Sequence, residues 1–229
     1  MNDRSQQGGA PRPPVVLVDD EGRAVGSAPL VDAHEGRGLK HRAFTLLVLD
    51  ADGHLVLARR APSKPLWPGA WDGTVASHPV EGESQTDAAR RRAIEELAAD
   101  VEPFELGAVD YRVDFEHESG RPFAENEHCA VLVARLAPGV ELRPDPAEVD
   151  AVRTVRLESL LAASPAVWRT HCPGLPLALE VVRRSRTSLP TEFRRAFRAL
   201  ERPGAVGQLA AAIEELVPRG EWRVVAAER

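Results

Sequence analysis

The sequence contains little cysteine. Cys129 and Cys172 are the only two in 229 residues, and they lie far apart in the chain. Two distant cysteines do not form a disulfide framework, so we expect a reduced, cytoplasmic protein. No apolar run approaches the roughly 20 residues of a membrane-spanning helix. The first segment, MNDRSQQGGAPRPP, lacks the hydrophobic core of a signal peptide, and we interpret residues 1–14 as a disordered tail.

The chain also lacks a surplus of positive charge. Its 29 lysines and arginines are outnumbered by 35 aspartates and glutamates, which gives a formal net charge of -6. A general nucleic-acid-binding protein normally carries a basic surplus, so we expect no nucleic-acid partner. An anionic ligand must therefore be held by local groups of arginine and lysine.

Apolar segments bounded by turn residues predict the strands. Two of these segments carry an Asp-containing turn that ends in glycine and are interpreted as hairpins. Another pair of strands is expected around a turn at Ser119–Gly120. The expected strand segments are 15–28 and 43–60, each a hairpin, followed by 105–118, 126–136 and 151–157.

Helical patterns come later in the chain and at its end. Residues 84–99 form one expected helix, with Ser84 as its N-cap. After Pro173 the chain is expected to be helical to near its end. The predicted fold is α/β (α+β): a mixed β-sheet flanked by helices at 15–172, with a C-terminal helical extension at 173–229 that packs on it.

Histidines and glutamates suggest a metal site. His34 and His41 flank a segment that leads into a strand, and His78 lies in a later loop. Glu125 and Glu127 alternate with Asn126, so a strand places both carboxylates on one face. An isolated histidine is more often structural, but three imidazoles and two carboxylates together can complete an octahedral site for a divalent metal. The other histidines, interpreted as structural or surface residues, are His54, His117, His128 and His171.

The expected helix at 84–99 carries both arginine and glutamate. Arg92 and Glu96 are four residues apart and can share a face. In one interpretation this is a surface helix with internal salt bridges. In the other, glutamate holds Mg²⁺ while arginine contacts phosphate oxygens, which are the ligands each prefers.

Several motifs resemble a known family. Residues 77–99 are similar to a Nudix box in which both glycines are replaced, by Ser77 and Ala98, and Arg92 replaces the first glutamate of the helical part. Over about residues 15–170 the chain resembles type I isopentenyl-diphosphate isomerases. The segments that carry the resemblance are DAHEGRGLKHRAF, LARRAPSKPLWPGAWDGTVASHP, GES, RRRAIEEL and ENEHC.

The resemblance implies a Nudix fold and a set of site residues. Glu127 and Glu96 would be catalytic, and Glu96 would hold the Mg²⁺ that bridges to a substrate diphosphate. A second divalent metal (Mg²⁺, Mn²⁺ or Zn²⁺) would be bound by His34, His41, His78, Glu125 and Glu127. The diphosphate-binding cations would be Arg60, Lys64 and Arg92. The expected hydrophobic pocket residues are Trp71, Ala76, Phe115 and Trp168.

Departures from the family leave the reaction open. Ala76 stands where the family carries a catalytic cysteine, and Leu30 stands where it usually carries a lysine. Ala76 cannot transfer a proton, whereas Glu127 can protonate a double bond. The first hypothesis is an isomerase-type enzyme that isomerises, rearranges or cyclises a prenyl diphosphate. The alternatives are a Nudix hydrolase of a prenyl or nucleoside diphosphate, supported by the Glu95–Glu96 pair, and a non-catalytic diphosphate-binding protein.

Overall fold

The computed structural model describes residues 13–117, 120–217 and 221–225. Most of the predicted tail, and Ser119 of the predicted turn, lie outside these residues. The strands are β1 (Val15–Val18), β2 (Ala24–Ala28), β3 (His41–Leu49), β4 (Leu55–Arg60), β5 (Trp71–Asp72), β6 (Val75–Ser77), β7 (Phe104–Glu116), β8 (Pro122–Arg135), β9 (Val149–Val155) and β10 (Trp222–Val225). The helices are α1 (Leu30–His34), α2 (Gln85–Leu97), α3 (Leu157–Leu161), α4 (Pro165–Trp168), α5 (Gly174–Arg184), α6 (Thr191–Phe197), the 3₁₀ helix η1 (Arg198–Glu201) and α7 (Ala205–Leu216).

The described strands form one mixed sheet with β3 near its centre. Along one path the order is β10-β7-β8-β3-β1-β2. One edge of β3 pairs with β8 in parallel, and its other edge pairs in turn with β1, β6 and β4. Of the nine residues of β3, only Arg42 is not buried. A strand covered on both faces is expected to be a nearly continuous apolar run, which is the sequence of β3.

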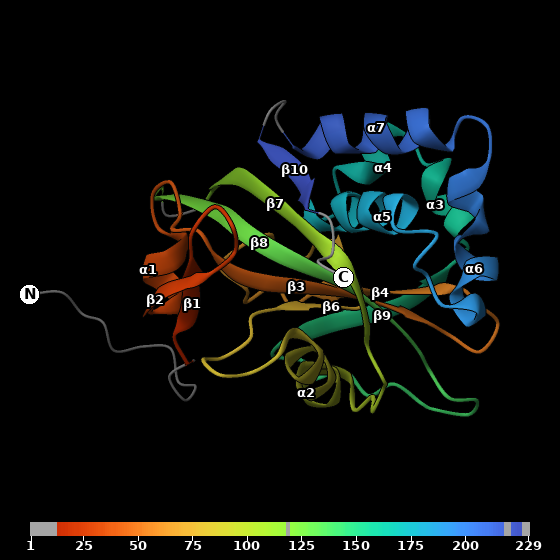
Figure 1. Cartoon of the computed structure of the whole chain (residues 1–229), viewed down its shortest axis with the longest axis horizontal. Coiled ribbons are helices and arrows are strands. Elements are labelled where there is room, and N and C mark those ends of the chain that lie inside the picture. The colour runs from red at the N-terminus through yellow and green to blue at the C-terminus, as the bar shows by residue number, and fades with distance from the viewer. Residues whose placement is uncertain (1–12, 118–119, 218–220, 226–229) are drawn as a thin grey trace, which may run out of the picture.

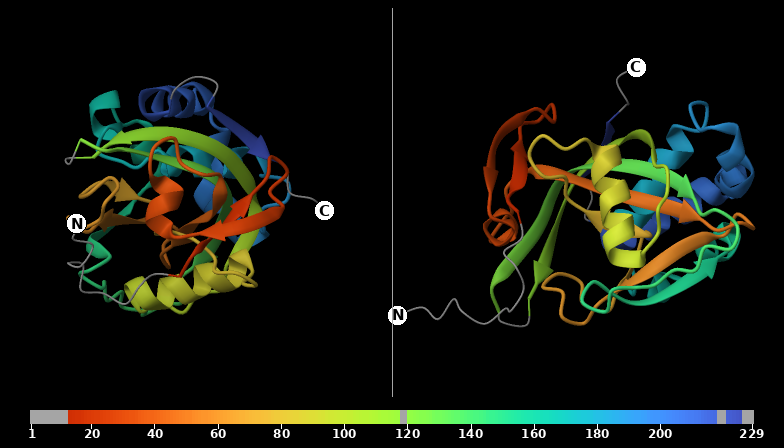
Figure 2. Two further views of the ribbon diagram at one scale, coloured as in Figure 1. Left: turned by 90° about the vertical axis from the view of Figure 1, so that its left-hand side faces the viewer. Right: turned by 90° about the horizontal axis from the view of Figure 1, so that it is seen from below.

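Helices cover both faces of the sheet. In Figure 1, α2 lies below β3 and β6, α3, α4, α5 and α7 lie above the sheet at one end, and α6 lies beside that end; the left view of Figure 2 shows α2 and α7 on opposite sides. Leu47 of β3 and Val131 of β8 share one buried core with Leu177 and Val181 of α5. The helices after Pro173 therefore extend the core of the sheet.

The start of α2 has a favourable cap, whereas its end has a residue in a strained conformation. Ser84 is the N-cap, because its hydroxyl oxygen accepts the backbone N–H of Asp87 at 3.1 Å, which confirms the predicted start. The helix ends at Ala98, which has a left-handed conformation with φ of 53°. A glycine at this position would adopt the same φ without strain from a Cβ atom.

The predicted strands and hairpins are confirmed, but several short elements were not predicted. The segment between β4 and α2 contains the short strands β5 and β6, and α1 and α4 are only five and four residues long. The strand β10 pairs antiparallel with β7 inside the segment expected to be helical. Among the described residues, no helix is both long and apolar enough to span a membrane.

Candidate active site

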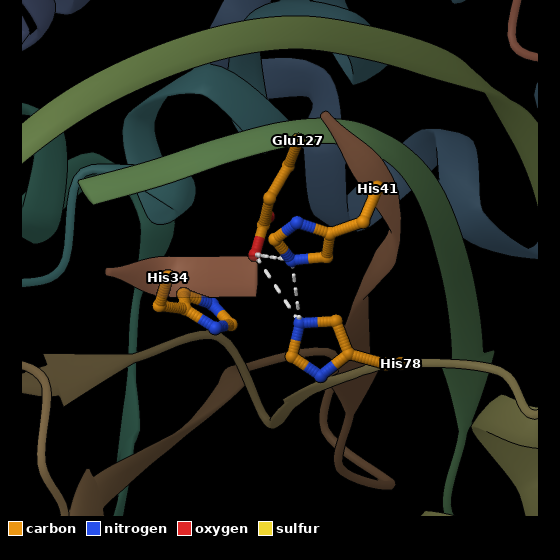
Figure 3. A group of neighbouring side chains, drawn as sticks. All are labelled: His34, His41, His78 and Glu127. Carbon is orange, nitrogen blue, oxygen red and sulfur yellow. Dashed lines mark hydrogen bonds and ion pairs between the residues drawn. The ribbon is translucent and has the colours of Figure 1, made fainter. Parts of the chain in front are cut away.

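Three predicted metal ligands and one predicted catalytic carboxylate meet at one point. His34 comes from α1, His41 from β3 and Glu127 from β8, and His78 follows β6. Their potential ligand atoms all lie within 4.8 Å of one another, and Figure 3 shows the rings of His41 and His78 directed toward Glu127. Nε2 of His78 lies 3.2 Å from Nε2 of His41 and 3.5 Å from Oε1 of Glu127.

Two of the three imidazoles at this point, His34 and His41, are held in a metal-binding form. Nδ1 of His34 donates to the carbonyl oxygen of Leu30 at 2.8 Å, and Nδ1 of His41 donates to that of Leu39 at 2.7 Å. Since a carbonyl can only accept, the proton sits on Nδ1 and leaves Nε2 with a free lone pair. Burial lowers the pKa of His34 to about 4 and that of His41 to about 3, so both rings are neutral at pH 7. A neutral imidazole is the form that binds metal.

A buried carboxylate, Glu127, and a half-buried one, Glu125, lie next to the histidines and share a tyrosine. The hydroxyl of Tyr111 lies 2.8 Å from Oε2 of both Glu125 and Glu127. Burial opposes ionisation of Glu127, but hydrogen bonding and charge from His78 outweigh it and lower the pKa to about 2. Burial and the nearby charge of Glu127 raise the pKa of Glu125 well above its usual value. Glu125 therefore keeps its proton to higher pH than Glu127, and Tyr111 connects Glu125 to the cluster.

A cavity of about 350 Å³ opens beside the cluster. The three cations expected to bind a diphosphate all line it. Arg60 is fixed by a hydrogen bond from Nε to the carbonyl oxygen of Leu66 at 2.9 Å. Lys64 forms an ion pair with Glu148, and Nη2 of Arg92 lies 2.6 Å from Glu96. Sequence reasoning missed Glu148, because no motif links it to Lys64.

Glu96 lies apart from the histidine cluster. It lines a smaller neighbouring cleft together with Glu148, and this cleft shares Arg60, Lys64 and Asp72 with the main cavity. Burial raises the pKa of Glu96, and Arg92 opposes that effect. The structure thus brings two carboxylates together where the sequence predicted one.

The cavity walls differ from the predicted pocket. Ala76 lines the cavity, as expected, but Trp71 lies outside the lining and stacks under the guanidinium of Arg153 at 4.0 Å. Phe115 contacts the ring of Trp67 at 4.8 Å instead, and Trp168 is buried in the core under the C-terminal helices. The structure places none of these three aromatic residues in the cavity lining, because an aromatic residue in a motif need not face the site. Lining residues that the prediction omitted include Leu30, Phe44, Thr45, Asp72, Tyr111, His117, Arg121, Phe123, Cys172 and Gly174.

The glutamate of the box-like segment has a structural role. Glu83 accepts two hydrogen bonds from Arg91, at 2.7 and 2.8 Å, and one from the backbone N–H of Val80 at 3.0 Å. These bonds fasten the loop after His78 to the first half of α2. His78 is therefore positioned from both sides, by β6 before it and by this loop after it.

The fold and the box-like helix define the class of protein. The NUDIX domain family model matches residues 39–172. A crystal structure from Deinococcus radiodurans shares the fold, with a TM-score of 0.50 and 23% identity over 65% of this chain and 86% of that chain.

Two archaeal relatives narrow the assignment. An isopentenyl-diphosphate Delta-isomerase of Haloarcula marismortui is 39% identical over 170 residues, which cover 73% of this chain and 90% of the relative. One of Halobacterium salinarum is 40% identical over 167 residues, covering 72% and 78%. The chain belongs to the type I isopentenyl-diphosphate isomerase family of Nudix proteins, and the predicted family and fold are confirmed.

Proposed function

We propose that this chain is a metal-dependent enzyme of the isopentenyl-diphosphate isomerase type that protonates a double bond of an isoprenoid diphosphate. The observation that supports this most strongly is that one cavity has two chemically different ends. One end carries the histidine–glutamate cluster, and the other carries Arg60, Lys64 and Arg92. The relatives' name, isopentenyl-diphosphate Delta-isomerase, matches this combination.

The residues present fit two divalent metals. His34, His41, His78 and Glu127, with Glu125 beside them, would hold one metal (Mg²⁺, Mn²⁺ or Zn²⁺), because neutral imidazole and carboxylate suit all three. A bound divalent ion would supply positive charge that makes neighbouring proton donors more acidic. Glu96 would hold Mg²⁺ together with the diphosphate oxygens.

The side chains of the cavity suit the proposed reaction. Arg60, Lys64 and Arg92 would orient the diphosphate, and the apolar walls would exclude water from the carbon chain. Glu127 would deliver the proton to the alkene. Glu125 keeps its proton to higher pH than Glu127, and the Tyr111 hydroxyl between the two carboxylates would pass that proton to Glu127.

The test is incubation with Mg²⁺ and Mn²⁺ in D₂O with C5, C10 and C15 prenyl diphosphates, followed by mass spectrometry. Deuterium in a rearranged product that keeps its diphosphate supports the proposal. Glu96 and Glu148 lie side by side at the cation end and favour hydrolysis as a second candidate function, which would release phosphate. Binding without turnover would identify a non-catalytic family member.

A further inference from the structure

Isomerisation needs two proton operations, and the family position that would supply one of them is Ala76. One group adds a proton to the alkene, and a second group removes a proton from another carbon. Ala76 lines the cavity but has no ionisable atom. A second proton-transfer group must therefore come from elsewhere in the cavity wall.

The topology of the sheet places a second acid across from Glu127. The stretch of β3 around Thr45 pairs with β8 on one edge and with β6 on the other. Glu127 belongs to β8, and Asp72 belongs to β5, which leads into β6 through Gly73 and Thr74. Both carboxylates line the cavity, with Thr45 on the strand between them. Asp72 and Glu127 thus reach the cavity from opposite sides of β3.

The backbone holds Asp72 firmly at this place. Its Oδ1 accepts the N–H of Gly73 at 2.7 Å, and its Oδ2 lies 3.9 Å from Nη1 of Arg60. A Cβ atom at Gly73 would lie 2.8 Å from Cγ2 of Thr45, so only glycine allows this close approach to β3. Asp72 is only 6% exposed and is therefore a buried carboxylate directed at the cavity.

Its chemical surroundings suit a proton acceptor. Burial raises the pKa of Asp72 above its usual value, although Arg60 opposes this effect. A diphosphate bound to Arg60 would add negative charge nearby and make the carboxylate a stronger base. Cys172 also lines the cavity beside Asp72, and burial raises the pKa of its thiol well above the usual value, so the thiol stays protonated.

We propose that Asp72 is the second proton-transfer residue of the reaction and takes the position in the mechanism that a thiol at Ala76 would have. This proposal rests on the proposed function. Glu127 gives its proton to the terminal alkene carbon, and a carbocation forms. A C–H bond then breaks at the carbon next to the one that carries the diphosphate. Its electron pair becomes the new double bond, and its proton goes to Asp72, so protons and charge balance and exchange with solvent restores both acids.

The contact between Asp72 and Arg60 accounts for the choice of the carbon that loses its proton. The carbon that loses the proton is one bond from the carbon bearing the diphosphate, and Arg60 connects the diphosphate-binding end to Asp72. Cys172 acts as a positioning residue, because a protonated thiol next to Asp72 can donate to the carboxylate and keep it oriented.

The experiment compares Asp72→Asn, Asp72→Glu and Cys172→Ala with the unaltered chain in the D₂O assay. Calorimetry with inorganic diphosphate and Mg²⁺ measures binding, and thermal melting measures folding. Asp150→Asn is the matched control, because Asp150 is an acid on β9 that pairs with Arg59 at 2.6 Å outside the cavity lining. We expect Asp72→Asn to lower kcat at least 100-fold with diphosphate binding within threefold, as removal of a general base does.

The other variants sharpen the result. Asp72→Glu should keep measurable turnover and shift the acidic limb of the pH profile of kcat, and Cys172→Ala should lower kcat less than tenfold. Turnover by Asp72→Asn within threefold of the unaltered chain would overturn the proposal. So would a loss explained wholly by weaker diphosphate binding, which would make Asp72 part of the diphosphate site. If Asp72→Asn fails to fold, an unshifted pH profile of Asp72→Glu overturns the proposal instead. Absence of deuterium uptake by the unaltered chain would overturn the proposed function itself, and this proposal with it.

Discussion

The two ends of the cavity balance their charges differently. At the histidine end, the neutral rings of His34 and His41 and the ring of His78 face the ionised Glu127, and the four cluster residues include no lysine or arginine. At the other end, Lys64 and Arg92 are already neutralised, by Glu148 and Glu96. The first end thus presents metal ligands around the charge of Glu127. At the second end, the charges of Lys64 and Arg92 are balanced by nearby carboxylates.

This difference predicts two kinds of metal dependence. A cation at the histidine end would relieve the buried negative charge of Glu127 and stabilise the folded chain. At the other end, a diphosphate must compete with Glu96 and Glu148 for the same cations. Mg²⁺ bound to those carboxylates would free the cations for the diphosphate, so metal and diphosphate should bind there together.

The largest expected effect is at the acid of the histidine end. We expect Glu127→Gln to lower kcat about 1,000-fold, because the amide cannot deliver a proton. Binding of inorganic diphosphate should change less than threefold, since Arg60, Lys64 and Arg92 pair with other carboxylates, Asp72, Glu148 and Glu96. Deuterium uptake and calorimetry measure the two quantities. Unchanged turnover would remove Glu127 from the mechanism, and equal losses in both would mean that the two ends are not separate.

The second largest effect should follow removal of a buried imidazole ligand, which should weaken metal binding. His41→Ala deletes a fully buried ring of the cluster, and we expect about 100-fold weaker binding of Mn²⁺, measured by calorimetry without diphosphate. The control is His128→Gln, which changes a histidine paired with Asp110 outside the cluster. Equal Mn²⁺ affinity of His41→Ala and the unaltered chain would contradict a metal site at this end.

The stability of the metal-free protein should depend on pH through the same histidines. The folded pKa values, about 4 for His34 and about 3 for His41, lie below the ordinary value of 6.5, so the unfolded chain binds more protons in between. The free energy of unfolding should therefore fall as pH drops from 7 to 4.5, by roughly 4–5 kcal/mol for the two rings together. Urea unfolding with a chelator present measures this, and a flat profile would contradict neutral buried rings.

At the cation end the expected effect is smaller and concerns binding. Arg92→Met should raise KM about tenfold and change kcat less than threefold, since a charge-assisted contact to a diphosphate is lost and the acid is untouched. Arg90→Met is the control, because Arg90 is an arginine of the same helix that pairs with Asp100 outside the cavity. A kcat loss as large as that of Glu127→Gln would show that the two ends act as one.

The smallest expected effect concerns the end of α2, the helix that carries Arg92 and Glu96. Ala98 has a φ of 53°, and its side chain is exposed, so Ala98→Gly should raise the free energy of unfolding by about 0.5–1 kcal/mol. Ala162→Gly, at a helix end with a right-handed conformation, should lower it by a similar amount. Urea unfolding measures both, and a destabilised Ala98→Gly would show that its methyl group makes a needed contact.

The sequence predicted the parts of this protein that depend on local pattern or on a motif. Apolar segments on either side of Asp- and Gly-containing turns predicted the hairpins, Ser84 predicted the start of α2, and the motifs predicted the residues of the cluster. Trp71 shows the limit of this reasoning. On a strand, neighbouring side chains face opposite ways, so Trp71 turned toward Arg153 leaves Asp72 turned toward the cavity. The motif led to the prediction that Trp71 lines the pocket, whereas Asp72 was not predicted.

The missed residues depend on strand register and on distant packing. Tyr111 meets Glu127 because β7 and β8 pair in a register that no short pattern determines. Cys172 reaches the cavity because its backbone N–H donates to the carbonyl oxygen of Trp71 at 2.7 Å, a contact across 100 residues of sequence. Such positions follow from the folded sheet, so they could not be predicted from spacing.

Tyr111 also makes this site unusually open to spectroscopy. It is the only tyrosine of the chain, and its hydroxyl lies between the carboxylates of Glu125 and Glu127. Protein grown with tyrosine labelled with ¹³C at Cζ alone would therefore give a single ring resonance, and that resonance originates at the centre of the site. Its chemical shift would follow proton movement, metal arrival and substrate binding in the unmutated protein, one signal for each state.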